Sequence, residues 1–104
     1  MTAAQGPVKR ARILAVDADD LEMRRRRCLF RATHRGTKEM DWLLGRYAEA
    51  RLAEVDGAGL TFWEALVLVP DPQIHDWIMG VEAVEDVRTR AVIEAIRAFH
   101  GMDE

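Results

Sequence analysis

The chain has 104 residues, of which 49% are hydrophobic and 32% charged, and its formal net charge is −3. This length suits one domain with a modest core, and the composition is that of an ordinary globular protein. No apolar run approaches the roughly 20 residues that span a bilayer, so we expect no stable membrane insertion. The single cysteine, Cys28, excludes an internal disulfide.

The charges are unevenly distributed along the chain. Residues 1–38 contain ten Lys and Arg against four acids, whereas residues 39–104 contain five Arg and fourteen acids. Such a division favours electrostatic steering toward a partner, without identifying that partner.

Residues 1–18 show no sustained period, and we interpret them as a flexible N-terminal arm before a helical domain over residues 19–104. A first helix is predicted from Asp20 to about His34, with Gly36 as its C-terminal stop. At 100° per residue, four of its cations share one sector beside an apolar face: Arg24, Arg27, Arg31 and Arg35.

The remaining residues predict four more helices. Thr37 is expected to cap a helix over 38–55, followed by a loop at 56–59. Thr61 and Glu64 have capping-box spacing, which indicates a short buried helix over 60–69. A fourth helix is expected with Asp71 as cap, Pro72 at the first helical position and Gly80 as stop, and a fifth over 84–100. Because no alternating strand pattern is present, the predicted fold is all-α, a small single-domain five-helix bundle.

Catalytic chemistry has little support in this sequence. There is no serine, no glycine-rich phosphate loop and no histidine pair at metal-binding spacing, since the three histidines are scattered: His34, His75 and His100. Cys28 lies on the apolar side of its helix and is expected in the core. We therefore expect no enzyme activity, no metal site and no separate flavin pocket.

Two other features have alternative readings. The arginine sector fits a solvated helix face, an acidic protein partner or, less well, nucleic acid, since no aromatic residue is interleaved for base stacking. One tryptophan falls in each of three predicted helices, where packing in the core is more typical than anchoring an interface: Trp42, Trp63 and Trp77.

The stretch "RGTKE" at residues 35–39 places a glycine where two helices meet. Gly36 lacks a side chain, so a foreign backbone could approach closely there. Arg35 would supply a planar donor fork and Glu39 a carboxylate at the edges of that gap. Helix-dipole capping also explains the two charges. A contact surface requires that Gly36 be uncovered and that Arg35 and Glu39 not be locked to each other.

Two segments, "HRGTKEMD" at 34–41 and "DPQIHDWIMG" at 71–80, resemble the succinate dehydrogenase assembly factor family, whose hallmark is an Arg-Gly-x-x-Glu motif. The resemblance implies a five-helix bundle that is not itself an enzyme. Such factors bind the flavoprotein subunit of succinate dehydrogenase, and in some bacteria that of fumarate reductase, and promote covalent attachment of FAD to a client histidine.

By this resemblance, Arg35, Gly36 and Glu39 are the motif residues that face the client, and His34 occupies a position that is basic in many relatives. The full set of predicted contact residues is Arg31, His34, Arg35, Gly36, Glu39, Asp41 and Trp77. No FAD is expected to be held stably. The absence of a long presequence favours the bacterial cytoplasm over the mitochondrial matrix. The alternatives are an antitoxin-like regulatory protein and a nucleic-acid-binding helical module.

Overall fold

The computed structural model describes residues 20–102, and the arm expected over residues 1–18 lies outside them. Five helical segments occur in this part of the chain, which contains no strand, so the all-α prediction is confirmed. The first spans residues 20–33. The second runs over residues 38–54 and comprises α2 (Lys38–Met40), a π-helical turn η1 (Asp41–Gly45), α3 (Arg46–Arg51) and a 3-10 turn η2 (Leu52–Glu54). The others are α4 (Gly57–Leu66), α5 (Asp71–Met79) and α6 (Val87–Phe99).

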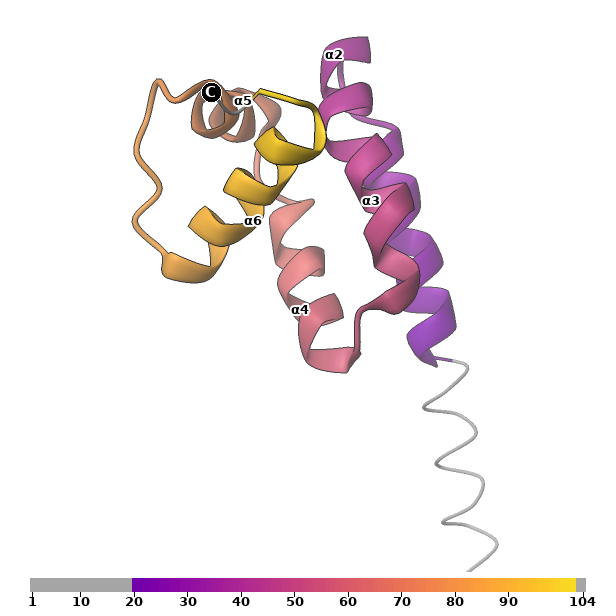
Figure 1. Ribbon diagram of the computed structural model, residues 1–104. Helices are drawn as coiled ribbons and strands as arrows, with labels where there is room; N and C mark the ends of the chain where they lie inside the picture. Colours follow the sequence, from indigo (N-terminus) through magenta and orange to yellow (C-terminus); the bar gives the residue numbers. More distant parts are fainter. Residues whose placement is uncertain (1–19, 103–104) are drawn as a thin grey trace, which may run out of the picture.

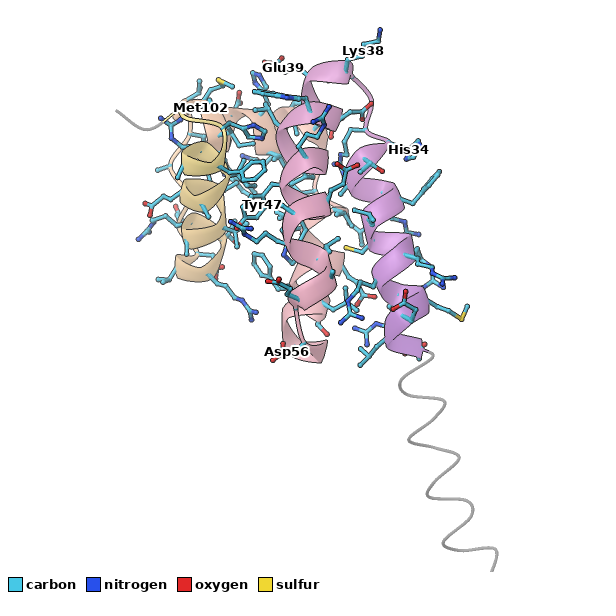
Figure 2. All side chains as sticks on the ribbon, turned by 45° about the vertical axis from the view of Figure 1, so that its right-hand side comes forward. His34, Lys38, Glu39, Tyr47, Asp56 and Met102 are labelled. Carbon is cyan, nitrogen blue, oxygen red and sulfur yellow. The ribbon has the colours of Figure 1, made fainter. Side chains whose placement is uncertain are left out.

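The second helix is central to the arrangement, because it lies between the first helix and α6 (Figures 1 and 2). Its contact with the first helix is very close at Gly45. A Cβ built there would lie 3.0 Å from Thr33 Cα and 3.1 Å from the Ala32 carbonyl oxygen. These distances are tighter than most Cβ contacts, so a side chain at this position would require the two helices to move slightly apart.

The core is built from the facing sides of all five segments. Sixteen hydrophobic residues are buried, among them Cys28, Leu44, Trp63, Ile78 and Ile96. Burial of Cys28 and Trp63 confirms their predicted place in the core. The same prediction is wrong for Trp42, whose side chain is 47% exposed and whose ring is tilted by 40° against the His100 ring, with centroids 4.1 Å apart. Trp77 is half-buried and packs against the edge of the core.

Some helix ends have the predicted caps, whereas the starts of α4 and α6 differ from the prediction. Thr37 caps α2, since its hydroxyl oxygen accepts the Met40 amide at 3.1 Å, and Gly80 ends α5 with a φ of 78°. The capping box at Thr61 and the loop at 56–59 are wrong, because Asp56 caps α4 by accepting the Gly59 amide at 2.8 Å. Likewise α6 begins at Val87, three residues later than predicted, and is capped by Asp86.

Two further corrections concern the motif region. The first helix ends at residue 33, where the Thr33 hydroxyl donates to the Leu29 carbonyl at 2.8 Å, and Gly36 does not have the positive φ of a glycine stop. Pro70, not Asp71, occupies the N-cap position of α5. Asp71 therefore has its carboxylate available for another partner. No helix in residues 20–102 is long and apolar enough to cross a membrane.

Candidate functional site: the turn at residues 34–39

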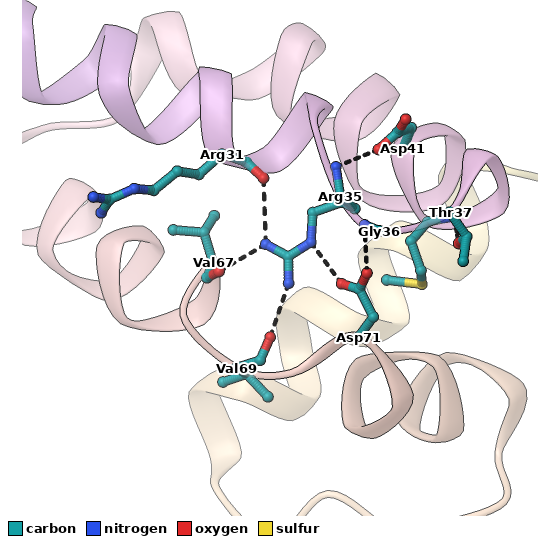
Figure 3. A network of polar contacts seen from close by, with 9 residues as sticks. Arg31, Arg35, Gly36, Thr37, Asp41, Val67, Val69 and Asp71 are labelled. Atoms are coloured by element: carbon teal, nitrogen blue, oxygen red, sulfur yellow. Dashed lines mark hydrogen bonds and ion pairs between the residues drawn. The ribbon is translucent and has the colours of Figure 1, made fainter.

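The Arg35 side chain is turned into the fold, as Figure 3 shows. Its Nε donates to Asp71 Oδ1 at 2.7 Å, Nη1 to the Val67 carbonyl at 2.7 Å and Nη2 to the Val69 carbonyl at 2.8 Å. Nη1 also lies 3.3 Å from the carbonyl oxygen of Arg31. Only 8% of the Arg35 side chain is exposed. The planar guanidinium thus fastens the end of the first helix to the connection between α4 and α5.

Asp71 receives two donors from the motif. Its Oδ1 accepts Arg35 Nε, and its Oδ2 accepts the Gly36 amide at 2.9 Å. On the other side of the turn, Asp41 Oδ1 accepts the Arg35 amide. Successive backbone amides of the turn are therefore fixed by carboxylates from two different helices. A turn held this way presents a preorganised surface, which lowers the entropy cost of binding.

The expectation that Arg35 offers a free donor fork is wrong in this structure, because its donors are already engaged within the fold. Asp41 is likewise part of this internal network. Both residues determine the shape of the turn, and direct contact of either with a partner stays a prediction.

Gly36 and Glu39 are placed differently. Gly36 is exposed, and a Cβ built on it would meet only Asp71 Oδ2, at 3.3 Å. The Glu39 side chain is 60% exposed, and its Oε2 lies 3.4 Å from His75 Nε2 on α5. Glu39 lies at the tip of the second helix beside Lys38 (Figure 2). Glu39 is not paired with Arg35, and Gly36 remains uncovered, so both requirements for a contact surface are met.

The remaining predicted contact residues are divided between two places. His34 and Arg31 are exposed near the turn. The His34 ring stacks on Phe30 with centroids 3.9 Å apart, and its Nδ1 lies 2.9 Å from the Phe30 carbonyl oxygen. Trp77 instead lines a hollow of about 270 Å³ with residues of α4 and α6, including Phe62 and Thr89. It is not among the residues that form the network around Arg35.

The predicted four-cation sector is also wrong as a continuous surface. Arg24 Nη2 pairs with Glu64 Oε1 at 2.8 Å, and this hydrogen bond raises the pKa of Arg24 and lowers that of Glu64. Arg35 lies in the internal network described above. Only Arg27 and Arg31 of the predicted four remain exposed at the surface. The expectation that no aromatic residue is interleaved with these arginines is also wrong, because Phe30 lies between Arg27 and Arg31 in the sequence and is 60% exposed.

Two partners of the motif were not anticipated from the sequence. The sequence predicts Asp71 as the cap of its own helix and His75 as one of three scattered histidines. The acidic residue at the start of "DPQIHDW" was the only available signal for the first. No local spacing could reveal it, since Arg35 and Asp71 are 36 positions apart.

The described residues show no group of three or more His, Cys, Asp or Glu side chains that could hold a metal. Cys28 is 2% exposed, and its burial raises the pKa of the thiol to about 11. The thiol therefore stays protonated at neutral pH, whereas a nucleophile needs the thiolate.

Fold and site together define a small all-helical protein that presents one rigid, glycine-centred turn at its surface. The family model described as "Flavinator of succinate dehydrogenase" matches residues 26–100. The chain belongs to this family, as the resemblance predicted.

Curated relatives agree with the assignment. The chain is 40% identical over 77 residues to the FAD assembly factor of Acetobacter pasteurianus, covering 74% of this chain and 71% of that protein. It is 31% identical over 67 residues to the FAD assembly factor of Xylella fastidiosa, covering 64% of this chain and 69% of that one. The mitochondrial succinate dehydrogenase assembly factor 2 of Dictyostelium discoideum is 29% identical over 77 residues, covering 73% of this chain and 55% of its own length. No solved structure matches.

Proposed function

We propose that this protein is an assembly factor that binds the flavoprotein subunit of succinate dehydrogenase and promotes covalent attachment of FAD to it. The observation that carries the proposal is the turn at 34–39. Its glycine is uncovered and its glutamate exposed, while Arg35 and Asp71 hold the backbone rigid. The family assignment and the bacterial relatives named as FAD assembly factors support it.

In the proposed mechanism the factor acts as a binding partner, and the covalent bond forms in the client. By binding one arrangement of the client's domains more tightly, the factor shifts the population toward the form that aligns flavin and histidine. A differential affinity of about 3 kcal/mol changes that population on the order of a hundredfold. The chain needs no flavin pocket of its own for this role.

Within this proposal Gly36 and Glu39 contact the client directly. A client main chain can approach Gly36, since the glycine presents no side chain and has one near neighbour, the Asp71 carboxylate. The exposed carboxylate oxygens of Glu39 can accept hydrogen bonds from the client beside Gly36. Arg35 acts through the turn that it positions and is not expected to reach the client.

The fumarate reductase flavoprotein is a second proposed client. This proposal requires that the two flavoprotein subunits share the surface that meets the turn. We propose the bacterial cytoplasm as the location, because two of the curated relatives are bacterial FAD assembly factors. The mitochondrial relative makes the matrix the alternative location.

The test is co-expression with the succinate dehydrogenase flavoprotein subunit, followed by in-gel fluorescence of covalently bound flavin. Gly36→Arg fills the gap and Glu39→Ala removes the carboxylate, so both should lower the flavin signal well below that of the wild type. Ala91→Arg and Glu94→Ala are matched controls on the exposed side of α6. The proposal fails if both turn variants support flavinylation as well as the two controls do.

A further inference from the structure

The outer face of the first helix carries two apolar side chains that are more than half exposed in residues 20–102, Met23 and Phe30. Met23 is 56% exposed and Phe30 60% exposed. Residues 23, 30 and 34 lie within one narrow sector at 100° per residue, opposite the buried Cys28 and Ala32. Isolated exposed apolar residues are ordinary, but a row of them along one helix marks an interaction surface more often.

Arginines border this row on both sides. Arg26 lies along one edge, where 77% of its side chain is exposed and its Nε pairs with Glu22 Oε2 at 3.4 Å. Arg27 and Arg31 lie along the other edge. We call the row of Met23, Phe30 and His34 with these three arginines the Met23–Phe30 ridge.

The neighbouring arginines serve the fold instead. Arg24 pairs with Glu64 at 2.8 Å, and Arg25 donates to the Leu52 and Val55 carbonyls at 2.9 and 2.6 Å. The helix therefore separates its cations into an inner set that packs it and an outer set that faces away.

The ridge continues into the turn that carries the proposed function. His34, at its end, stacks on Phe30, and Thr33 Oγ1 lies 3.0 Å from His34 Nδ1. Thr33 also lines a surface hollow of about 290 Å³ together with Lys38 and the exposed Trp42. Thr33 therefore links the end of the ridge to the hollow beside the turn.

We infer that the Met23–Phe30 ridge is a second contact for the client flavoprotein, and that it takes a client segment in which carboxylates flank an apolar side chain. The inference rests on the proposed function, since it assigns the ridge to the same partner as the turn. Charge complementarity supports it, because an apolar row bordered by Arg27 and Arg31 on one side, and by Arg26 with its Glu22 partner on the other, fits an acidic segment better than a basic one. Arginine and aromatic side chains are also the residue types that most often dominate interface energetics.

Binding of the purified protein to the purified flavoprotein subunit tests the inference. Phe30→Ser and Arg27→Glu should each weaken the affinity about tenfold, the typical loss for an important interface side chain. Leu68→Ser and Arg88→Glu are the matched controls: Leu68 is 69% exposed near the end of α4, and Arg88 is exposed on α6. Binding by Arg27→Glu should also depend less steeply on salt than wild-type binding.

The outcomes separate the inference from the proposed function. If Phe30→Ser and Arg27→Glu bind as tightly as their controls while Gly36→Arg does not bind, the footprint stops at the turn and the inference is overturned. It is also overturned if Arg27→Glu keeps client affinity but no longer binds phosphatidylglycerol vesicles, because the ridge would then face a lipid surface. Unchanged flavinylation with Gly36→Arg and Glu39→Ala instead removes the proposed function itself.

Discussion

Replacing Asp71 by Asn is expected to loosen the turn at 34–39 without removing any atom from its packing. The side chain keeps its shape, but it loses the charge that pairs with Arg35. It also loses one of the two acceptors that serve Arg35 Nε and the Gly36 amide. Whichever way the amide is oriented, its NH₂ group faces one of these two donors.

The magnitude follows from the burial of the pair. Removing one partner of a fully buried ion pair costs about 3–5 kcal/mol. The Asp71 side chain is 21% exposed, and Arg35 keeps its bonds to the Val67 and Val69 carbonyls. A loss of about 2 kcal/mol is therefore expected, which corresponds to a fall in Tm of about 8–16 °C for a domain of this size.

Thermal unfolding followed by circular dichroism measures the first effect, and client affinity well below the lowered Tm measures the second. Arg35→Lys keeps the charge but not the fork, so it should also lose stability and affinity. Asp76→Asn, on the same helix, is the control. A Tm within about 2 °C of wild type for Asp71→Asn would refute the assigned role of the pair.

Three other perturbations test separate parts of the structure. Gly45→Ala should cost about 1–3 kcal/mol by forcing the first two helices apart, whereas Gly57→Ala, whose Cβ would have its nearest neighbour at 3.8 Å, should be neutral in the same denaturant titration. Because the pKa of Cys28 is raised from 9.0 to about 11 in the folded protein, the thiol ionises at lower pH in the unfolded chain. The free energy of unfolding should therefore fall between about pH 9 and pH 11, by up to about 3 kcal/mol. Urea titrations of Cys28→Ala across this pH range should not show this loss. His100→Ala removes the ring nitrogen that donates to the Leu43 carbonyl at 2.8 Å, so the free energy of unfolding should fall by about 1–2 kcal/mol in thermal unfolding. The exposed apolar control Val81→Ala should leave it nearly unchanged.

Local signals in the sequence predicted the fold class and most helix ends. The apolar period, the Thr37 cap and the Gly80 stop depend on residues within one or two turns of each other, and all three were confirmed. The errors at Asp56 and Thr61 have a simple physical origin. Several residues near the start of α4 can accept an amide hydrogen, and tertiary packing determines which one does.

The sequence predicts where the candidate site lies, but it does not predict that the arginine of this site is engaged inside the fold. A short motif gives the position of Arg35, and its pairing depends on the α4–α5 connection, which no nearby residue announces. The prediction for Trp42 rested on the general preference of tryptophan for the core, whereas in the structure its ring lies against His100 at the surface.

The Asp71 carboxylate limits how the turn at 34–39 and the start of α5 can be exchanged between proteins. Because one acidic group serves both the arginine and the glycine amide of the other motif, neither Arg35 nor Asp71 can be replaced by a neutral residue without leaving its charged partner uncompensated. The two residues therefore form a single structural unit split across the chain. Exchanging the turn with that of another family member should therefore succeed only when the start of α5 is transplanted along with it.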